Sequence, residues 1–343
     1  MILYSGNKKK SFNDSSIRNN NNSLKVALCA IGKEENLYVR EWVKYYKDLG
    51  LKKIILYDNN ELEGEKFEEV INDYIESKFV EVIDRRGIIK TVKTDMDGMS
   101  LQGLAYRDCY YNNYKNYDWL FFFDLDEFLC IDFKYKNIFE FLNDFNEYDG
   151  IKVQWRNFGD NGNLHYENKT VIERFKNKNN FKFSNVVKII IKCKKYDFNV
   201  LFNAHSILSD IPIIVNLNKK RIKISENKSH QDVTSFEPYN NLPVYLDHFK
   251  TKSTEEFIKR KYMKTVADHG ALNTYWTYSL SQLKWTYFNI NKITKEKEKM
   301  FDLLENNGNL KRKRNRNRKK YKSRNKNKNK KIYINKNKNK NEL

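Results

Sequence analysis

The fold is decided by residues 118–129, which read DWLFFFDLDEFL. The apolar part, Trp119–Phe123, has no polar alternation, and this is typical of a strand that is covered on both faces of a mostly parallel sheet. Five apolar residues are too few to cross a membrane. We therefore expect a central buried strand at this position.

Three carboxylates follow this apolar run within four positions, at Asp124, Asp126 and Glu127. The strand period of two predicts that Asp124 and Asp126 point to one face, at the carboxyl end of a strand, where open α/β sheets bind ligands. Carboxylates this close are best tolerated with a cation between them, and hard oxygen ligands suit Mg²⁺ or Mn²⁺. The alternative is that the acids merely begin a surface loop, but the fully apolar strand before them favours a metal site.

Strands and helices alternate along the first 130 residues. Buried strands are expected at 24–31, 53–57 and 79–83, and helices at 38–49, 67–75 and 101–117. This order predicts an α/β fold with a Rossmann-like, mostly parallel sheet flanked by helices. The turn at 32–35 carries acids where a dinucleotide-binding turn has glycines, which argues against a nicotinamide cofactor. Asp58 closes the second strand and is a candidate nucleoside contact, with a turn or capping role as the alternative.

Positive charge is concentrated at the end of the sequence. The net charge is +21, but residues 311–343 contain 17 Lys and Arg and one acid, so residues 1–310 carry only +5. We expect a disordered lead-in at 1–23, a folded α/β domain at 24–265, a helical extension at 266–310 and a disordered basic tail at 311–343. Such a tail can bind anionic membranes or RNA.

The four cysteines, at positions 29, 109, 130 and 193, lack Cys-x-x-Cys spacing. This spacing argues against a zinc site and against a disulfide framework, so we expect reduced and mostly buried cysteines. The sequence has neither the apolar core of a secretory signal nor a run of about 18 apolar residues. A cytoplasmic protein, with peripheral membrane contact through its tail, is therefore expected.

Several segments together resemble the glycosyltransferase family 2 and family 92 group. The resemblance covers roughly residues 25–265, and no single segment carries it alone. It rests on Lys33-Glu34-Glu35, Glu41–Tyr45, Leu49-Gly50, Leu56–Asn59, Gln102 with Ala105-Tyr106, Trp119 and Asp124–Leu129, Trp155–Gly159, Asn185–Lys188, Asn203–His205 and Asp247–Ser253. The chain departs from the usual pattern at Glu34, Tyr46 and Ile189, where the group commonly has Asn, His and Ser.

The resemblance implies a GT-A fold that uses a nucleotide-diphosphate sugar, with UDP the expected nucleotide, and inverts the anomeric centre. Carried over, Asp124 and Asp126 hold Mn²⁺ or Mg²⁺ on the donor diphosphate. His248 is the first candidate for a late metal-binding histidine, and His205 is the second. Glu35, Asp58 and Gln102 are assigned to the donor side.

Three further residues are candidates for transfer chemistry. Lys188 begins an apolar strand and can pair with a phosphate, or it can be a solvated strand-end lysine. Inverting transfer needs a group that takes the acceptor hydroxyl proton, and Asp160, in a polar turn, is a candidate base, with Glu173 as an alternative. A second reading of the whole sequence is a nucleic-acid- or membrane-associated protein bound through its tail, whose Rossmann-like domain is nuclease-like or inactive.

Overall fold

The computed structural model describes residues 24–88, 100–176, 181–194, 201–202, 205, 207–208, 213–222, 242–262 and 280–303. Within these residues, nine strands form one sheet in the order β3-β2-β1-β4-β7-β6-β11-β5, with β10 beside β6. The strands are β1 (Val26–Gly32), β2 (Lys53–Asp58), β3 (Val80–Asp84), β4 (Trp119–Phe122), β5 (Glu127–Ile131), β6 (Gly150–Phe158), β7 (Phe181–Lys192), β10 (Ile214–Val215) and β11 (Val244–His248). A short pair, β8 (Leu201–Phe202) and β9 (Ile207–Leu208), lies apart from the main sheet.

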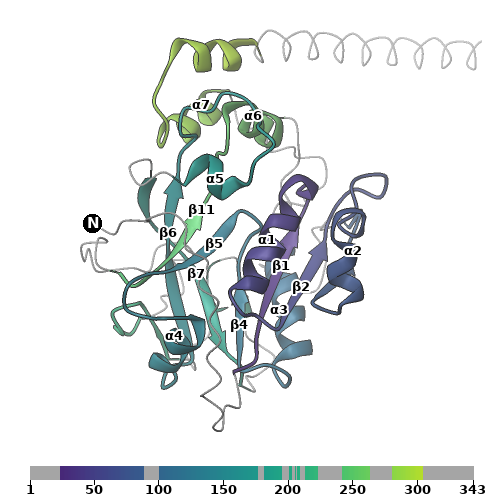
Figure 1. Cartoon of the computed structure of the whole chain (residues 1–343), viewed down its shortest axis with the longest axis vertical. Helices are drawn as coiled ribbons and strands as arrows, with labels where there is room; N and C mark the ends of the chain where they lie inside the picture. Colours follow the sequence, from purple (N-terminus) through teal and green to yellow (C-terminus); the bar gives the residue numbers. More distant parts are fainter. Residues whose placement is uncertain are drawn as a thin grey trace, which may run out of the picture.

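Helices pack against this sheet, and α5, α6 and α7 gather at one end of it (Figure 1). They are α1 (Asn36–Asp48), α2 (Glu68–Glu76), α3 (Leu101–Asn113), α4 (Ile138–Asp144), α5 (Val171–Phe175), α6 (Thr254–Tyr262) and α7 (Leu280–Phe288), followed by a helical segment at 295–303. None of the helices in the described part of the chain is both long and apolar enough to cross a membrane.

Strand β4 is buried on both faces, as its sequence predicts. Trp119, Phe121 and Phe123 belong to the core under α1 and α2, whereas Leu120 and Phe122 belong to the core under α3. The strands β1, β2, β3 and β4 pair in parallel, and antiparallel pairing begins where β7 joins β4. The predicted α/β class, with a mostly parallel sheet between helices, is confirmed.

The chain leaves β4 one residue earlier than expected, at Phe122. Residues 123–126 form a turn into β5, which pairs with β11 in antiparallel orientation. The two aspartates therefore do not share one face of a continuing strand, as the period of two predicted. They lie on a turn, so the backbone can aim each carboxylate at different neighbours.

Helix boundaries follow local chemistry. The Ser100 hydroxyl accepts a hydrogen bond from Gly103 N and caps α3, which ends at Asn113 rather than at the predicted residue 117. Gly50 follows α1 with a φ of +101°, a conformation that suits glycine and ends the helix as predicted.

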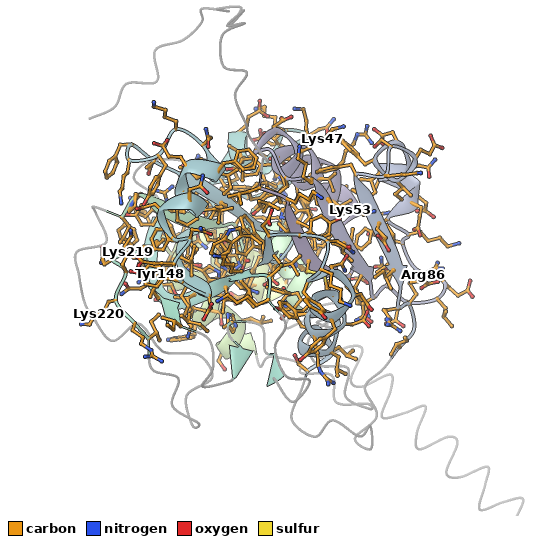
Figure 2. The ribbon with its side chains drawn as sticks, turned by 90° about the horizontal axis from the view of Figure 1, so that it is seen from below. Lys47, Lys53, Arg86, Tyr148, Lys219 and Lys220 are labelled. Atoms are coloured by element: carbon orange, nitrogen blue, oxygen red, sulfur yellow. A yellow bond between two sulfur atoms is a disulfide. The ribbon has the colours of Figure 1, made fainter. Side chains whose placement is uncertain are left out.

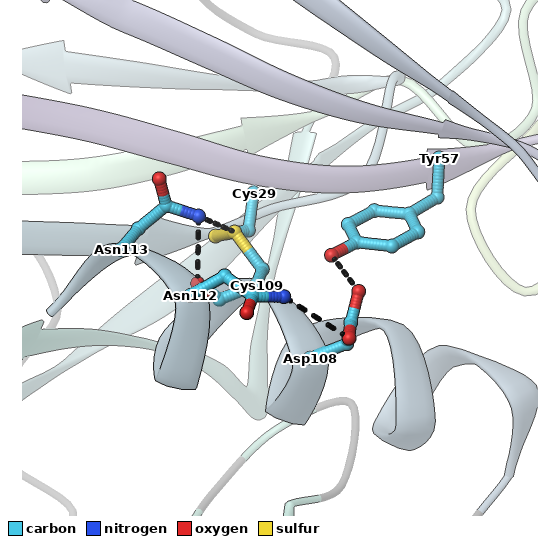
Figure 3. The surroundings of a disulfide bond; sticks show 6 residues. All are labelled: Cys29, Tyr57, Asp108, Cys109, Asn112 and Asn113. Atoms are coloured by element: carbon cyan, nitrogen blue, oxygen red, sulfur yellow. Dashed lines mark hydrogen bonds between the residues drawn. A yellow bond between two sulfur atoms is a disulfide. The ribbon is translucent and has the colours of Figure 1, made fainter.

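A disulfide joins β1 to α3, between Cys29 and Cys109, with Cα atoms 6.3 Å apart (Figure 3). The prediction that all cysteines are reduced is therefore wrong. The two residues are 80 positions apart and share no motif, and only the packing of α3 on the sheet brings them together. Cys130 and Cys193 are free thiols.

A separate apolar cluster joins the C-terminal helices to each other. It contains Phe257 and Ile258 from α6, Leu283 and Tyr287 from α7, and Phe301 from the segment at 295–303. Residues from both sides of the boundary expected at 265 thus pack into one cluster. The expected tail at 311–343 and lead-in at 1–23 lie outside the described residues.

Two cations at the surface of the folded part pair with nearby acids. Arg86 and Lys220 lie at opposite edges of the ribbon in Figure 2. Arg86 pairs with Asp84 at 2.8 Å, and Lys219, next to Lys220, pairs with Asp144 at 2.8 Å. These local pairs agree with the low net charge of residues 1–310.

Candidate active site

The Asp124 carboxylate lies at the carboxyl end of β4, next to two hydrogen-bond donors and a lysine ammonium. Its Oδ1 accepts from Gln102 Nε2 at 2.5 Å and from Tyr106 OH at 3.2 Å, and Lys188 Nζ is 2.8 Å away. Burial would raise the pKa of Asp124, but the Lys188 ammonium lowers it below its ordinary value. Asp124 is therefore ionised, and its Oδ1 already has three partners.

Lys188 is completely buried within β7, so the alternative of a solvated strand-end lysine is wrong. Its ammonium also lies 3.8 Å from Glu127 Oε1. Asp124 and Glu127 keep its pKa above the ordinary value despite the burial. Lys188 thus supplies a fixed positive charge beneath the acidic turn.

Asp126 faces a histidine from the neighbouring strand β11. His248 Nε2 lies 3.5 Å from Asp126 Oδ1, and His248 Nδ1 forms a 2.9 Å hydrogen bond with Asn157 Oδ1 on β6. Burial lowers the pKa of His248, while Asp126 acts in the opposite direction. Because Asn157 Oδ1 is an acceptor, Nδ1 is the donor in that contact, and Nε2 lies on the side of Asp126, where a metal ion could bind.

Glu127 completes a cluster of possible metal ligands. Asp126, Glu127 and His248 each offer one ligand atom, and these atoms lie within 4.8 Å of one another. Glu127 Oε2 accepts from Asp124 N at 2.9 Å, whereas its buried Oε1 has no hydrogen-bond partner among the described residues. Burial, followed by the charge of Asp124, raises the pKa of Glu127 well above its ordinary value. Two carboxyl groups and an imidazole are ligand types that suit Mn²⁺ or Mg²⁺.

Arg260 on α6 bridges two buried acids beside this cluster. Its Nη1 is 2.8 Å from Asp126 Oδ2, and its Nη2 is 2.7 Å from Glu35 Oε1. Burial would raise the pKa of Asp126, but the charge of Arg260 holds it well below its ordinary value. Helix α6 thus reaches across to the turns that follow β1 and β4.

The turn after β1 is tied to the turn after β2. Glu34 has a φ of +58°, a conformation that Asn adopts more readily than most residues, and its N donates to Asn60 Oδ1 at 2.7 Å. Asn60 in turn donates from N and Nδ2 to Asp58 Oδ1, at 2.9 and 2.7 Å. Burial raises the pKa of Asp58 although the Asn60 bonds lower it. Asp58 therefore organises this turn, and a nucleoside contact by Asp58 stays a prediction.

A cavity of about 430 Å³ opens beside these turns. Ile31 and Asn59, at the carboxyl ends of β1 and β2, line one side, and Arg85 follows β3. Ala105 and Asp108 of α3 line another side, and Asp108 accepts a 2.6 Å hydrogen bond from Tyr57 OH (Figure 3). The cavity combines apolar walls with a few polar groups, as small-ligand sites do.

The two acids predicted as general bases have other partners. Asp160 is buried, its Oδ2 lies 2.5 Å from Lys297 Nζ, and it accepts a hydrogen bond from Tyr287 OH. Glu173 forms a capping box with Thr170 at the start of α5. The structure brings neither acid into the metal-ligand cluster, and a base role for either stays a prediction.

His205 is placed differently from His248. Its Nδ1 lies 2.9 Å from the Val187 carbonyl oxygen, and its ring packs edge-on against Trp155 with centroids 5.5 Å apart. It is outside the ligand cluster found among the described residues. The structure therefore favours His248 over His205 as a metal ligand.

The sequence missed three residues of the site, Tyr106, Asn157 and Arg260, and it missed Glu127 as a possible metal ligand. Asp124, which it predicted as a ligand, lies outside the ligand cluster found among the described residues. Tyr106 and Asn157 lie inside segments that carry the family resemblance, so their position there was an available signal. Arg260 lies on a polar helix, where its spacing from the acids, 134 residues in the case of Asp126, gave no signal.

Comparison with known proteins agrees with this geometry. The sequence profile of glycosyltransferase family 92 matches residues 22–260. A glycosyltransferase family 92 protein of Oryza sativa subsp. japonica is 25% identical over 104 residues, which cover 30% of this chain and 16% of the rice protein.

Two solved structures show distant similarity. Staphylococcus aureus TarS covers 39% of this chain and 22% of its own, with 10% identity and a TM-score of 0.27. A putative glucose-1-phosphate thymidylyltransferase from Bacillus anthracis covers 50% and 72%, with 12% identity and a TM-score of 0.26. These low scores carry no argument, whereas the family profile covers most of the sequence. This chain belongs to glycosyltransferase family 92.

Proposed function

We propose that this protein is a metal-dependent, inverting glycosyltransferase. It transfers a sugar from a nucleotide-diphosphate sugar, with UDP the expected nucleotide, to a hydroxyl of a glycan or glycoconjugate. The family supports glycosyl transfer in general. The metal, the donor and the stereochemical outcome are parts of the proposal.

One observation carries the metal requirement: Asp126, Glu127 and His248 are buried, and one ligand atom of each lies within 4.8 Å of the others. Ionised carboxylates this close to each other repel, and a cation between them makes their ionised forms favourable. Asp126, Glu127 and His248 would hold this cation, and the contact of His248 Nδ1 with Asn157 Oδ1 leaves Nε2 on the side of Asp126. A bound Mn²⁺ or Mg²⁺ would stabilise the negative charge on the leaving diphosphate.

The cavity beside α3 supports the donor assignment. Its lining residues Asn59 and Arg85 lie where parallel strands end, which is where α/β sheets bind ligands. Its volume, about 430 Å³, is within the usual range for small-molecule sites. Asp124, which Gln102, Tyr106 and Lys188 hold in place, would orient the donor between this cavity and the metal ligands.

The proposal is tested by nucleotide release from a panel of nucleotide sugars, with and without metal. We expect release that EDTA abolishes and that Mn²⁺ or Mg²⁺ restores. Full activity after exhaustive chelation would refute metal dependence. Release from no donor in the panel, with metal present, would count against the transferase assignment.

Two histidine variants locate the metal. His248→Ala should raise the Mn²⁺ concentration for half-maximal activity by ~10–100-fold, the range expected when a metal site is disturbed. His205→Ala is the matched control and should leave that concentration nearly unchanged. The reverse result would assign the ligand role to His205.

The basic segment at 311–343 supports a second, separable proposal, namely peripheral contact with anionic membranes or RNA. Each basic residue near an anionic membrane surface contributes ~1 kcal/mol of attraction. Deletion of 311–343 should leave nucleotide release unchanged and abolish sedimentation with phosphatidylserine vesicles. Unchanged sedimentation would refute the membrane contact.

A further inference from the structure

Arg260 is the residue of the site whose role the metal proposal leaves open. The Arg260 side chain is 30% exposed, whereas the side chains of the two acids that it bridges, Glu35 and Asp126, are only 3% and 5% exposed. Arginine stays charged at any physiological pH. A permanent cation thus lies between the turn after β1 and the turn after β4, on a side chain that is partly exposed.

Asp126 is shared by this guanidinium and the candidate metal ligands. Arg260 contacts Oδ2 at 2.8 Å, and His248 Nε2 approaches Oδ1 at 3.5 Å. A divalent cation bound next to His248 would share one carboxylate with the Arg260 guanidinium, and the two cations repel each other. Additional negative charge is needed to make both favourable at the same time.

A diphosphate has the charge and the shape that this arrangement needs. Guanidinium groups bind phosphate oxygens through two parallel hydrogen bonds, and they are the preferred side chain for such recognition. Because the Arg260 side chain is partly exposed, a ligand can reach it while Glu35 retains Nη2. Arginine clamps of this kind stabilise charge on phosphate leaving groups.

A buried lysine near Arg260 also supports a diphosphate site. Lys252 Nζ and Glu35 Oε2 are buried, 3.9 Å apart, and neither has a hydrogen-bond partner among the described residues. Lys252 also lies over the Tyr38 ring, 4.1 Å from its centroid. The polar groups around Glu35 are therefore incompletely satisfied by the protein, as expected for a site that a ligand completes.

We propose that Arg260 binds the diphosphate of the donor, and that its ion pair with Asp126 balances the carboxylate while no metal is bound. This inference rests on the proposed function and names Arg260 as a residue that binds the leaving diphosphate of the proposed transfer. Without diphosphate, Arg260 competes with the metal for Asp126. When metal and diphosphate are both bound, Arg260 binds the diphosphate.

Opposite effects on two ligands test this role. In Arg260→Ala, the dissociation constant of Mn²⁺ alone should fall several-fold, because a competing cation is gone. The dissociation constant of inorganic pyrophosphate at saturating Mn²⁺ should rise ~10–100-fold, the equivalent of the roughly 1.5–3 kcal/mol of a charged hydrogen-bonded contact. Both constants are measured by calorimetry on the full chain, and neither depends on catalysis.

Two companion variants keep the test decisive. Arg260→Lys retains the charge beside Asp126 and loses the planar fork, so it should fold and still bind pyrophosphate more weakly. Lys259→Ala removes the adjacent cation, which pairs with Glu255 at 2.5 Å on the helix surface, and should change neither constant. If both ligands bind more weakly to the folded Arg260 variants, Arg260 merely positions Asp126 and the proposal is overturned.

Separate titrations with Mn²⁺ alone and with pyrophosphate alone distinguish this proposal from the proposed function. If the wild type binds no Mn²⁺ but binds pyrophosphate through Arg260, metal dependence fails and the diphosphate role stands. If pyrophosphate affinity is the same in wild type and Arg260 variants, or if the wild type binds no pyrophosphate, the diphosphate role is refuted.

Discussion

Tyr46 shows how one side chain can support the acidic turn. It stands where the group that the sequence resembles usually has histidine, and it is fully buried. Its hydroxyl donates to Glu127 O at 2.9 Å and accepts from Leu129 N at 3.2 Å. Tyr46 therefore holds two backbone groups at the start of strand β5. The departure from the usual residue thus retains a buried hydrogen-bonding side chain.

Tyr46→Phe should lower the free energy of unfolding by ~1–3 kcal/mol, because the buried Leu129 N–H loses its partner. The matched control is Tyr45→Phe, whose half-buried hydroxyl donates to Leu129 O at 2.7 Å. Urea unfolding should show a smaller loss for the control. Equal losses for both variants would contradict a specific role for Tyr46.

Glu256 joins helix α6 to α5 through a buried ion pair and to α1 through a hydrogen bond. Arg174 donates to Glu256 through Nη1 at 2.8 Å and Nη2 at 3.0 Å, and Tyr38 OH donates to Glu256 at 2.7 Å. Burial alone would raise the pKa of Glu256, but the bonds from Arg174 lower it below its ordinary value. The pair therefore stabilises the fold above the unfolded-state pKa of about 4.5.

The stabilisation by Glu256 should disappear as the pH falls below about 4.5 and passes through the lower folded-state pKa. Glu256→Gln should cost ~3–5 kcal/mol at pH 7, because Arg174 is left buried without its counter-ion. The difference from wild type should shrink between pH 5 and pH 3, as followed by urea unfolding at each pH. Glu173→Gln, in the exposed capping box, is the control and should show a smaller difference. A difference for Glu256→Gln that does not change with pH would argue against the ionised pair.

The C-terminal helices are attached to the loop after β6 through Asp160. Lys297 pairs with its carboxylate, Tyr287 donates to it, and Asn291 Oδ1 accepts from Asp160 N at 2.6 Å. Asp160→Asn should lower the free energy of unfolding by ~3–5 kcal/mol, because it leaves the Lys297 charge buried.

A double variant distinguishes this structural role from the predicted role as general base. Asp160→Asn with Lys297→Met replaces the buried pair and should recover most of the stability. Recovery of transfer activity together with stability would show that Asp160 is structural. A folded double variant without activity would support Asp160 as the base.

At the scale of the whole molecule, the disulfide connects the first strand to the helix that supports Asp124. Cys29→Ala with Cys109→Ala should lower the free energy of unfolding by roughly 2–4 kcal/mol, because the cross-link restrains an 80-residue span of the unfolded chain. Calorimetry should show the same loss when wild type is reduced. The variant with Ala at Cys130 and Cys193 is the control. No response of wild type to reductant would contradict the cross-link.

The disulfide also bears on the compartment. Disulfides persist in oxidising compartments and are rare in the cytosol. The cytoplasmic location expected from the sequence therefore stays a prediction, and the Cys29–Cys109 bond is an argument against it.

The sequence by itself determined the features that depend on neighbouring residues. The all-apolar Trp119–Phe123 run specified a strand buried on both faces, and the spacing of helices and strands specified the α/β class, because periodicity records which faces are covered. Acids directly after that strand marked the sheet edge at which His248 also lies.

The tertiary structure alone decided which distant groups meet. The pairing of Arg260 with Asp126, the hydrogen bond from His248 to Asn157, the burial of the Asp160 ion pair and the Cys29–Cys109 bond all join residues at least 80 positions apart. Their proximity depends on strand order, on antiparallel pairing of β5 with β11 and on the packing of α3 and α6. No local sequence pattern predicts these contacts, because the two partners of each contact come close only when the chain is folded.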